Sequence, residues 1–355
     1  NNAYRNSAIK LARTASTLFP LLQGISSISL LILLGLGTYQ LESGFISIGG
    51  LVALILYVER LVFPTALLGF TLNTFQLGQV SLDRVEEIFH NHPKIVDKAN
   101  TKFLTGNVKG FLEAKNLTVR YPGSKFNSLN GLNFKIHPGE LIAIVGPVGC
   151  GKTTLAKSLG RTIEIPDGQL FLDGIDIKTI KLRDLRKNVA IVPQEAFLFT
   201  STITENIRFG NPRASLGLIK ESATKAALID DINNFPQKFK TIVGERGITL
   251  SGGQRQRTAL GRALLVKSPI VVLDDALASV DNKTAAKIID EMREKSNKTV
   301  LMISHQLSVA ATCDRVLVID KGQIVQEGNH KDLVKKNGLY KQLWERELAT
   351  NIVRS

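Results

Sequence analysis

The sequence predicts a two-part protein, an α-helical membrane segment followed by an α/β domain with a mostly parallel sheet. Two long apolar runs before residue 73 indicate the first part. Apolar strands that alternate with helical segments after residue 110 indicate the second. Between one such strand and helix lies the glycine-rich stretch GPVGCGKT, residues 146–153.

The two apolar runs, about 18–39 and 45–72, are each long enough to cross ~30 Å of hydrocarbon at ~1.5 Å per helical residue. Both are apolar all round, whereas a helix on a soluble core alternates apolar and polar faces. We therefore expect residues 1–90 to form a hairpin in a lipid bilayer. No cleavable signal peptide is evident, and the absence of an initiator Met suggests a fragment of a longer chain.

Charges give this hairpin an orientation. Basic residues lie before the first run and after the second, and the link at 40–44 has none (Arg5, Lys10, Arg13, Arg84, Lys94). The positive-inside tendency then places both ends in the cytoplasm. Glu59 and Arg60 interrupt the second run, and such charges either face a cavity or partner helix or reach outward to the interface.

The net charge of +14 belongs entirely to residues 91–355, because residues 1–90 carry equal numbers of acidic and basic side chains. A basic domain suits polyphosphate ligands, anionic lipid or nucleic acid. The two cysteines, Cys150 and Cys313, make no disulfide framework or metal signature. We expect a linker at 91–109 and a soluble domain at 110–348, with a helical subdomain at about 195–265.

The strongest motif fits G-x-x-x-x-G-K-[ST] and opens a helix directly after the apolar strand LIAIV. Its glycines let backbone N–H groups approach phosphate oxygens, and the helix N-terminus adds its dipole. Lys152 is expected to reach the β- and γ-phosphates, and the Thr153 hydroxyl to bind Mg²⁺. The predicted nucleotide-binding residues of this loop are Gly146, Pro147, Val148, Gly149, Cys150, Gly151, Lys152, Thr153 and Thr154.

Two further stretches carry groups of the same chemistry. The buried strand IVVLDD ends in Asp274, a candidate Mg²⁺ partner, and Asp275 occupies the place of a general base or water-orienting carboxylate. LSGGQRQR starts another helix that can bind an anion. Its candidate nucleotide contacts are Ser251, Gly252, Gly253 and Gln254.

In order and spacing these motifs resemble those of ATP-binding cassette (ABC) exporters, in which membrane and nucleotide-binding domains share one chain. Residues 146–153 resemble the Walker A motif, 270–274 Walker B, 250–254 the signature and 243–247 an exporter-specific loop. The resemblance makes Tyr121 the adenine-stacking residue and Gln194 a Mg²⁺ contact that relays to the membrane domain. It makes His305 the switch histidine and Asp281 a contact across a dimer. His90, His92, His137 and His330 gain no such support and are interpreted as surface residues.

The resemblance implies ATP and Mg²⁺ as cofactors and a second half-transporter subunit as partner. Such exporters have six membrane helices, and this sequence matches the last two. In the family, two nucleotide-binding domains close head to tail over two ATP molecules, and each site takes its signature from the other subunit. Closure and hydrolysis drive alternating access, with the nucleotide-binding domain in the cytoplasm.

The sequence departs from the family at two positions. Asp275 stands where the family usually has Glu, so its carboxylate lies about one C–C bond closer to the backbone. A displacement of a catalytic group by ~1 Å can lower the rate on the order of 10²-fold. This change resembles the degenerate subunit of heterodimeric exporters, so a heterodimer is favoured over a homodimer. Cys150 replaces a residue that is commonly Ser, and one interpretation is a tolerated small residue. The other is a thiol whose pKa is lowered by Lys152 and the helix N-terminus, so that its alkylation blocks nucleotide binding unless ATP is present.

The predicted function is an ATP-driven export subunit with catalytic residues Asp275, His305 and Gln194 and metal ligands Thr153, Gln194 and Asp274. The alternative is an ATP-binding regulatory subunit whose own site is slow while a partner hydrolyses ATP. The membrane hairpin argues against a cassette ATPase that acts on nucleic acid. The exported substrate is not specified by the sequence.

Overall fold

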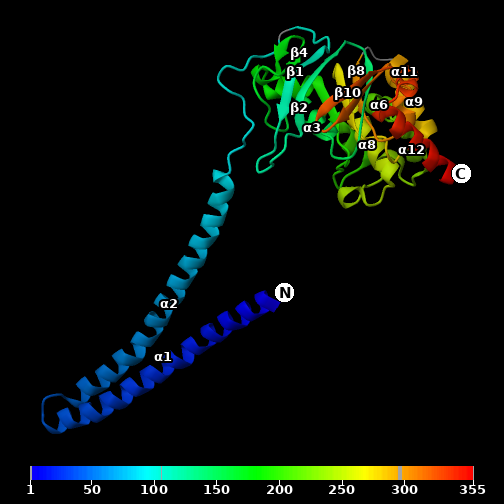
Figure 1. Cartoon of the computed structure of the whole chain (residues 1–355). Coiled ribbons are helices and arrows are strands. Elements are labelled where there is room, and N and C mark those ends of the chain that lie inside the picture. The colour runs from blue at the N-terminus through cyan, green and yellow to red at the C-terminus, as the bar shows by residue number, and fades with distance from the viewer. Residues whose placement is uncertain (1, 105, 295–297, 355) are drawn as a thin grey trace. The chain divides into compact units, whose positions relative to one another are not determined.

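The computed structural model describes residues 2–104, 106–294 and 298–354. The chain divides into two compact units, Asn1–Pro93 and Lys94–Ser355 (Figure 1). The first unit is helical, and the second contains both β-sheets and the remaining helices.

The N-terminal unit consists of helices α1 (Asn2–Glu42) and α2 (Ile48–His90). Their segments Pro20–Glu42 and Ile48–His90 are long and apolar enough to cross a membrane. The two helices pack closely at Gly37, where a Cβ atom would lie 2.3 Å from Cδ1 of Leu51. A glycine at this point therefore allows the backbones to approach, as small residues do in membrane helix pairs.

A cavity of about 430 Å³ lies between α1 and α2. Its polar lining comes from Glu59 on α2 and from Gln23, Ser26 and Ser27 on α1. Glu59 thus faces a cavity, one of the two positions predicted for a charge within the apolar run. Arg60 is exposed on α2 and is not among the lining residues.

The larger sheet of the C-terminal unit has six strands in the order β10-β9-β3-β8-β7-β6. All neighbouring strands are parallel except β10, which pairs antiparallel with β9. Every residue of β3, β7 and β8 is buried, as expected for parallel strands covered on both faces. The strands are β3 (Leu141–Val145), β6 (Val189–Val192), β7 (Ile270–Asp274), β8 (Thr299–Ile303), β9 (Arg315–Asp320) and β10 (Gln323–Gly328).

The smaller sheet is antiparallel, with the strand order β2-β1-β4-β5. The carboxylate of Asp173 fixes the start of β1 by accepting backbone N–H bonds from Lys109, Gly110 and Phe111 at 2.7–3.1 Å. The strands are β1 (Leu112–Val119), β2 (Leu129–Ile136), β4 (Leu170–Leu172) and β5 (Ile175–Asp176). The predicted fold class, a membrane helical segment followed by an α/β domain, is confirmed.

Helices surround these sheets, and α5 to α8 form a region with its own apolar core around Ile203, Ile207 and Ile219. The α-helices of the unit are α3 (Lys152–Leu159), α4 (Leu182–Asn188), α5 (Ile203–Arg208), α6 (Leu216–Lys225), α7 (Ile229–Asn234), α8 (Gly252–Leu265), α9 (Asn282–Glu294), α10 (Leu307–Ala310), α11 (His330–Lys335) and α12 (Leu339–Arg354). Short 3₁₀ helices are η1 (Ile177–Thr179), η2 (Lys238–Lys240) and η3 (Glu245–Gly247).

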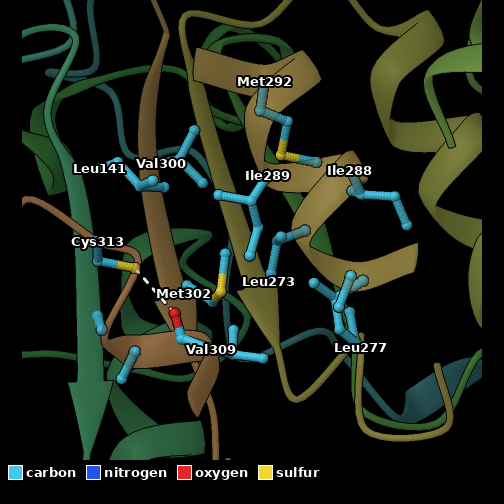
Figure 2. Close-up of a cluster of buried hydrophobic side chains, with 14 of the residues drawn as sticks. Leu141, Leu273, Leu277, Ile288, Ile289, Met292, Val300, Met302, Val309 and Cys313 are labelled. Atoms are coloured by element: carbon cyan, nitrogen blue, oxygen red, sulfur yellow. Dashed lines mark hydrogen bonds between the residues drawn. The ribbon is translucent and has the colours of Figure 1, made fainter. Parts of the chain in front are cut away.

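Two apolar cores lie on opposite faces of the larger sheet. One joins the sheet to α8, α9 and α10 and contains Leu273, Ile289 and Met302 (Figure 2). The other fills the space between the two sheets and packs Leu155 and Leu159 of α3 against Ile142 and Ile144 of β3. Helix α3, which follows the glycine-rich loop, is therefore held by buried contacts along its length.

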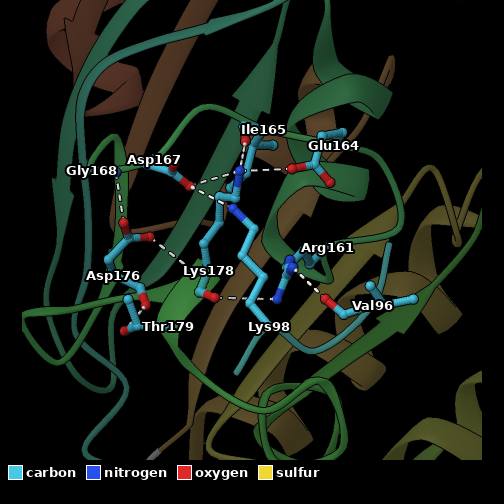
Figure 3. Close-up of polar contacts among 10 residues, drawn as sticks. All are labelled: Val96, Lys98, Arg161, Glu164, Ile165, Asp167, Gly168, Asp176, Lys178 and Thr179. Carbon is cyan, nitrogen blue, oxygen red and sulfur yellow. Dashed lines mark hydrogen bonds and ion pairs between the residues drawn. The ribbon is translucent and has the colours of Figure 1, made fainter. Parts of the chain in front are cut away.

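A buried lysine fixes the chain that follows α3 (Figure 3). Lys178 Nζ donates to the Ile165 carbonyl at 2.8 Å and pairs with Glu164 and Asp167 at 2.7 Å each. Burial acts to lower the pKa of Lys178, but the hydrogen bonds to the two carboxylates outweigh it, so the pKa is raised. The Arg161 side chain, which is 1% exposed, donates to the Val96 carbonyl and so joins residues before the domain to the end of α3.

Candidate functional site

The predicted site residues gather at one edge of the six-stranded sheet. Strands β3, β6, β7 and β8 run parallel, so their carboxyl ends meet at the same edge. The glycine-rich loop follows β3, Gln194 follows β6, Asp274 ends β7 and His305 follows β8. A parallel sheet binds ligands at the carboxyl ends of its strands, and this is where the motifs lie.

The glycine-rich loop requires glycine at two positions. Gly146 and Gly151 have φ of +151° and +111°, values that side-chain-bearing residues rarely adopt. A Cβ atom at Gly146 would lie 2.0 Å from the Ile319 carbonyl oxygen, and one at Gly151 would lie 2.3 Å from that of Ser128. The loop is thus packed against two backbone segments, which fixes the direction in which its N–H groups point.

Lys152, the first residue of α3, folds back over this loop. Its Nζ donates to the carbonyls of Gly146 and Pro147 at 2.8 and 2.9 Å, and the side chain is 6% exposed. In the described part of the chain its recorded oxygen partners are uncharged carbonyls. A buried ammonium with only neutral oxygen partners favours an anion, and a nucleotide phosphate fits this cradle.

The two predicted metal ligands of the loop and of β7 are in contact. Thr153 Oγ1 donates to Asp274 Oδ1 at 3.2 Å. No cluster of three or more His, Cys, Asp or Glu gathers around a metal position among the described residues. This donor set fits Mg²⁺, which usually keeps few protein ligands and completes its shell with water and phosphate oxygens.

Both acids of the LDD sequence are buried, Asp274 at 4% and Asp275 at 7% exposure. Burial raises the pKa of Asp274; the Thr153 hydrogen bond partly offsets this, and repulsion from Asp275 adds to it. Asp275 has a left-handed backbone with φ of +52°, a conformation that Asp tolerates better than most residues. Its Oδ1 accepts the backbone N–H of His305 at 3.4 Å, so the acid contacts the loop that carries the predicted switch histidine.

The predicted lowering of the Cys150 pKa is wrong. Burial raises the pKa of this thiol, and the nearby charge of Lys152 offsets that effect only in part. The Sγ atom lies 3.8 Å from Lys152 Nζ, but the residue is 4% exposed. The expectation of a reactive thiol neglected burial, which the sequence of the loop does not reveal.

The signature residues start helix α8. Ser251 caps the helix and forms a capping box with Gln254, which satisfies two backbone N–H groups. Gly253 packs against the backbone of Ser279, because a Cβ atom there would lie 2.7 Å from the Ser279 oxygen. The Gln254 side chain also donates to Asp231, at 3.0 Å.

Two residues that sequence reasoning missed connect the motifs. Gln256 accepts the Ser279 N–H at 2.9 Å and lies 3.5 Å from the Asp275 carbonyl, so it links α8 to the segment after β7. Asp231 binds both Gln254 and Arg257. Gln256 lies within the LSGGQRQR stretch but was not among its candidate contacts, and Asp231 lies outside every motif; only the packing of α8 against other elements brings their partners together.

The remaining predicted residues lie around this edge. The Tyr121 hydroxyl is 3.4 Å from Thr154 Oγ1, which places the ring beside α3. Val148, Gln194 and the His305 side chain are exposed. Asp281 accepts the Thr284 N–H at 2.9 Å and so caps the first turn of α9.

His330 corrects the prediction of a surface histidine. It is half-buried, its Nδ1 lies 2.8 Å from the Tyr340 hydroxyl, and its ring meets Trp344 edge-on at 4.7 Å. The reason is the packing of α11 against α12, which a single sequence does not show. His90, His92 and His137 are exposed, as predicted.

A cavity of about 750 Å³ lies at the opposite edge of the sheet, near Lys225, Lys267 and Ser268. Parallel strands begin there and helices end there. Lys225 is in the last turn of α6, and Lys267 follows the end of α8, where a cation complements the helix dipole. The positions of these two lysines are therefore explained by the ends of helices α6 and α8, and the candidate nucleotide site lies at the other edge of the sheet.

A glycine-rich loop, a buried acidic strand end and a capped signature helix on one α/β domain define an ABC-type nucleotide-binding domain. Comparison with known proteins agrees: residues 129–278 match the family described as ABC transporter. The chain belongs to the ABC transporter family.

Similar proteins include the multidrug resistance-like ATP-binding protein MdlA of Buchnera aphidicola, 39% identical over 93% of this chain and 57% of that protein. The ATP-dependent lipid A-core flippase of Haemophilus influenzae is 35% identical over 98% and 60%. A solved structure of a bacterial Atm1-family ABC exporter with ATP bound superposes with a TM-score of 0.84 at 33% identity, covering 98% of this chain and 61% of that one. The chain thus spans somewhat more than half the length of these relatives.

The predicted membrane localisation is confirmed. Helices α1 and α2 carry segments of membrane-spanning length and apolarity, and similar proteins are named as exporters or flippases. The ABC domain lies on the cytoplasmic side.

Proposed function

We propose that this chain is an ATP-driven export subunit that binds MgATP at the carboxyl edge of its six-stranded sheet. The observation that carries the proposal is the contact of Thr153 with Asp274, together with the buried ammonium of Lys152, which donates to the carbonyls of Gly146 and Pro147. Phosphate and Mg²⁺ are the ligands that satisfy both groups. Fusion to a membrane hairpin in one chain supports transport as the use of the bound nucleotide.

The residues at this edge of the sheet have different proposed roles, which follow from their chemistry. The loop N–H groups and Lys152 hold the β- and γ-phosphates, and Tyr121 stacks on the base. Thr153, Asp274 and Gln194 hold Mg²⁺, which supplies charge neutralisation when bound. Asp275 orients or deprotonates the attacking water, and His305 donates to the γ-phosphate.

The signature helix serves a second subunit in this proposal. Ser251, Gly252, Gly253 and Gln254 present an N-terminal helix end, which binds the γ-phosphate on a facing domain. ATP then links two domains, and loss of the γ-phosphate separates them. Relatives are named for multidrug resistance and lipid A-core movement, so their names do not select one cargo.

We further propose a heterodimer in which this chain contributes the slower site. Asp275 is shorter than Glu by one methylene, and a misplacement of ~1 Å can cost on the order of 10²-fold. Its left-handed φ of +52° and its bond to the His305 N–H hold the carboxylate close to the backbone. The intact signature completes the site of the partner.

The first experiment measures ATP binding and turnover of the full chain in lipid nanodiscs. Lys152→Ala is expected to weaken binding of a fluorescent ATP analogue at least 10-fold, whereas Lys157→Ala, an exposed lysine on the same helix, leaves binding unchanged. Equal binding by both variants and the parent would contradict the proposed site.

The second experiment addresses the slow site. Asp275→Glu is expected to raise turnover about 10-fold or more, with Asp290→Glu on the exposed face of α9 as the control. A parent chain that is already fast, with a Glu variant no faster, rules out the degenerate site. A chain that binds ATP and turns over only when mixed with a partner subunit supports the regulatory alternative.

A further inference from the structure

The C-terminal helix α12 reaches the loop that carries His305. Glu347 of α12 accepts the backbone N–H of Leu307 with Oε2 at 2.6 Å and that of Ser308 with Oε1 at 3.1 Å. These two N–H groups open the short helix α10, which begins two residues after His305. A carboxylate at a helix start meets both unpaired N–H groups and the positive end of the dipole.

The Glu347 carboxylate serves as the N-terminal cap of α10, because the residues next to the helix provide no capping side chain. Gln306 is the N-cap residue of α10, and its side chain makes no capping hydrogen bond. Other caps in this domain, such as Thr202 and Ser215, are local side chains. At α10 the capping group comes instead from 40 residues further along the chain.

Buried contacts fix the position of α12. Tyr340 is fully buried, and its backbone N–H donates to Gln326 of β10 at 2.9 Å. Leu343 and Trp344 pack against the core that contains β3, β7 and β8. Glu347 lies one turn beyond Leu343, so its carboxylate extends from an anchored helix rather than from a free end.

The His305 loop is therefore held from two sides. Asp275 accepts the N–H of His305, and Glu347 accepts the N–H groups of Leu307 and Ser308. Between them, Gln306 N–H donates to Ser304 Oγ at 3.0 Å. Four successive N–H groups are thus bound by side chains, and one of the two anchors outside the loop belongs to α12.

We propose that Glu347 is a positioning residue that fixes the His305 loop for ATP hydrolysis, so that the C-terminal helix sets the activity of the nucleotide site. The inference rests on the proposed function, because it assigns Glu347 a role in that reaction. Glu347 does not touch the nucleotide; it acts through the backbone of residues 305–308. Displacing α12 would release the loop while the phosphate cradle stays intact.

The test compares Glu347→Ala, Glu347→Gln and Glu345→Ala in the full chain in lipid nanodiscs. Glu345 is exposed on the same helix and serves as the control. Hydrogen exchange of peptides that span 305–310 reports the loop directly, without reference to activity. We expect Glu347→Ala to speed exchange of the Leu307 and Ser308 amides at least 10-fold and to lower kcat about 10-fold with KM for ATP unchanged.

Glu347→Gln keeps a single neutral acceptor oxygen, which can accept only one of the two backbone N–H groups, and is expected to give intermediate exchange and turnover. This variant also keeps the test decisive if the alanine variant folds poorly. Unchanged exchange in both variants, or faster exchange with unchanged kcat, would overturn the proposal. A parent chain that shows protected amides but no ATP turnover, alone or with a partner subunit, instead refutes the proposed function and with it the role of Glu347.

Discussion

Replacing Gly151 by Ala tests whether the loop is built by close packing as well as by backbone conformation. At φ of +111° an alanine is strained, with a cost of about 1–2 kcal/mol for a left-handed conformation. Its Cβ would also lie 2.3 Å from the Ser128 carbonyl oxygen and 2.9 Å from Leu129 Cδ2. Overpacking of this kind typically costs a further 1–3 kcal/mol, so the total destabilisation is about 3 kcal/mol.

Gly149→Ala separates the two contributions. Gly149 also has a positive φ, +81°, but a Cβ there meets nothing within 4 Å. It should therefore cost only the conformational part, about 1–2 kcal/mol. The difference of about 2 kcal/mol corresponds to roughly 4–8 °C in Tm for a domain of this size.

The assay is thermal unfolding of the full chain followed by fluorescence of Trp344, the single tryptophan, which packs against the domain core. The ordering expected is parent, then Gly149→Ala, then Gly151→Ala with the lowest Tm. Equal shifts for the two variants would refute the packing argument, because they differ in their surroundings and share the left-handed conformation.

Three other predictions follow from the buried polar groups. Lys178→Met should lower the free energy of unfolding at pH 7 by about 1–3 kcal/mol, because it leaves the Ile165 carbonyl without its donor. Lys178 holds the pKa of Asp167 below 3.8, so the stability that this ion pair contributes is present above pH ~3.8 and is lost as the pH falls further. In denaturant titrations, the difference in unfolding free energy between the parent and Lys178→Met should therefore become smaller below pH ~3.8. Burial lowers the pKa of His330 in the folded chain, so as the pH falls this histidine is protonated in the unfolded chain before it is protonated in the folded chain. The parent should therefore lose unfolding free energy as the pH falls below ~6.5. An equally steep loss in His330→Asn would exclude this residue as the cause. Burial raises the pKa of Cys150, and it raises that of Cys313 to about 12. Mass spectrometry should therefore find both thiols slow to alkylate at pH 7.5, with or without ATP. Rapid labelling of Cys150 that ATP prevents would instead support a thiol of lowered pKa in the loop.

The sequence predicted the parts of this protein whose signals are local. A membrane run is recognised by its length and its lack of charge, and a parallel buried strand by consecutive apolar residues. The glycine-rich loop is recognised because its backbone conformation requires glycine at fixed spacing. Because the predicted strands are mostly parallel, the carboxyl ends of β3, β7 and β8 meet at one edge of the sheet.

Side chains that act across distant elements could not be predicted in this way. Gln256, Asp231 and Glu347 resemble ordinary helix-surface residues in the sequence, and each finds its partner through packing. The lowered pKa predicted for Cys150 was wrong, and His330 is half-buried and not fully at the surface, for the same reason: burial depends on what covers a residue. The sequence alone determined the fold class, the membrane hairpin and the phosphate-binding motif, since these depend on near neighbours in the chain. Only the tertiary structure decided which acids, amides and helices meet around that motif, since those contacts join residues tens of positions apart.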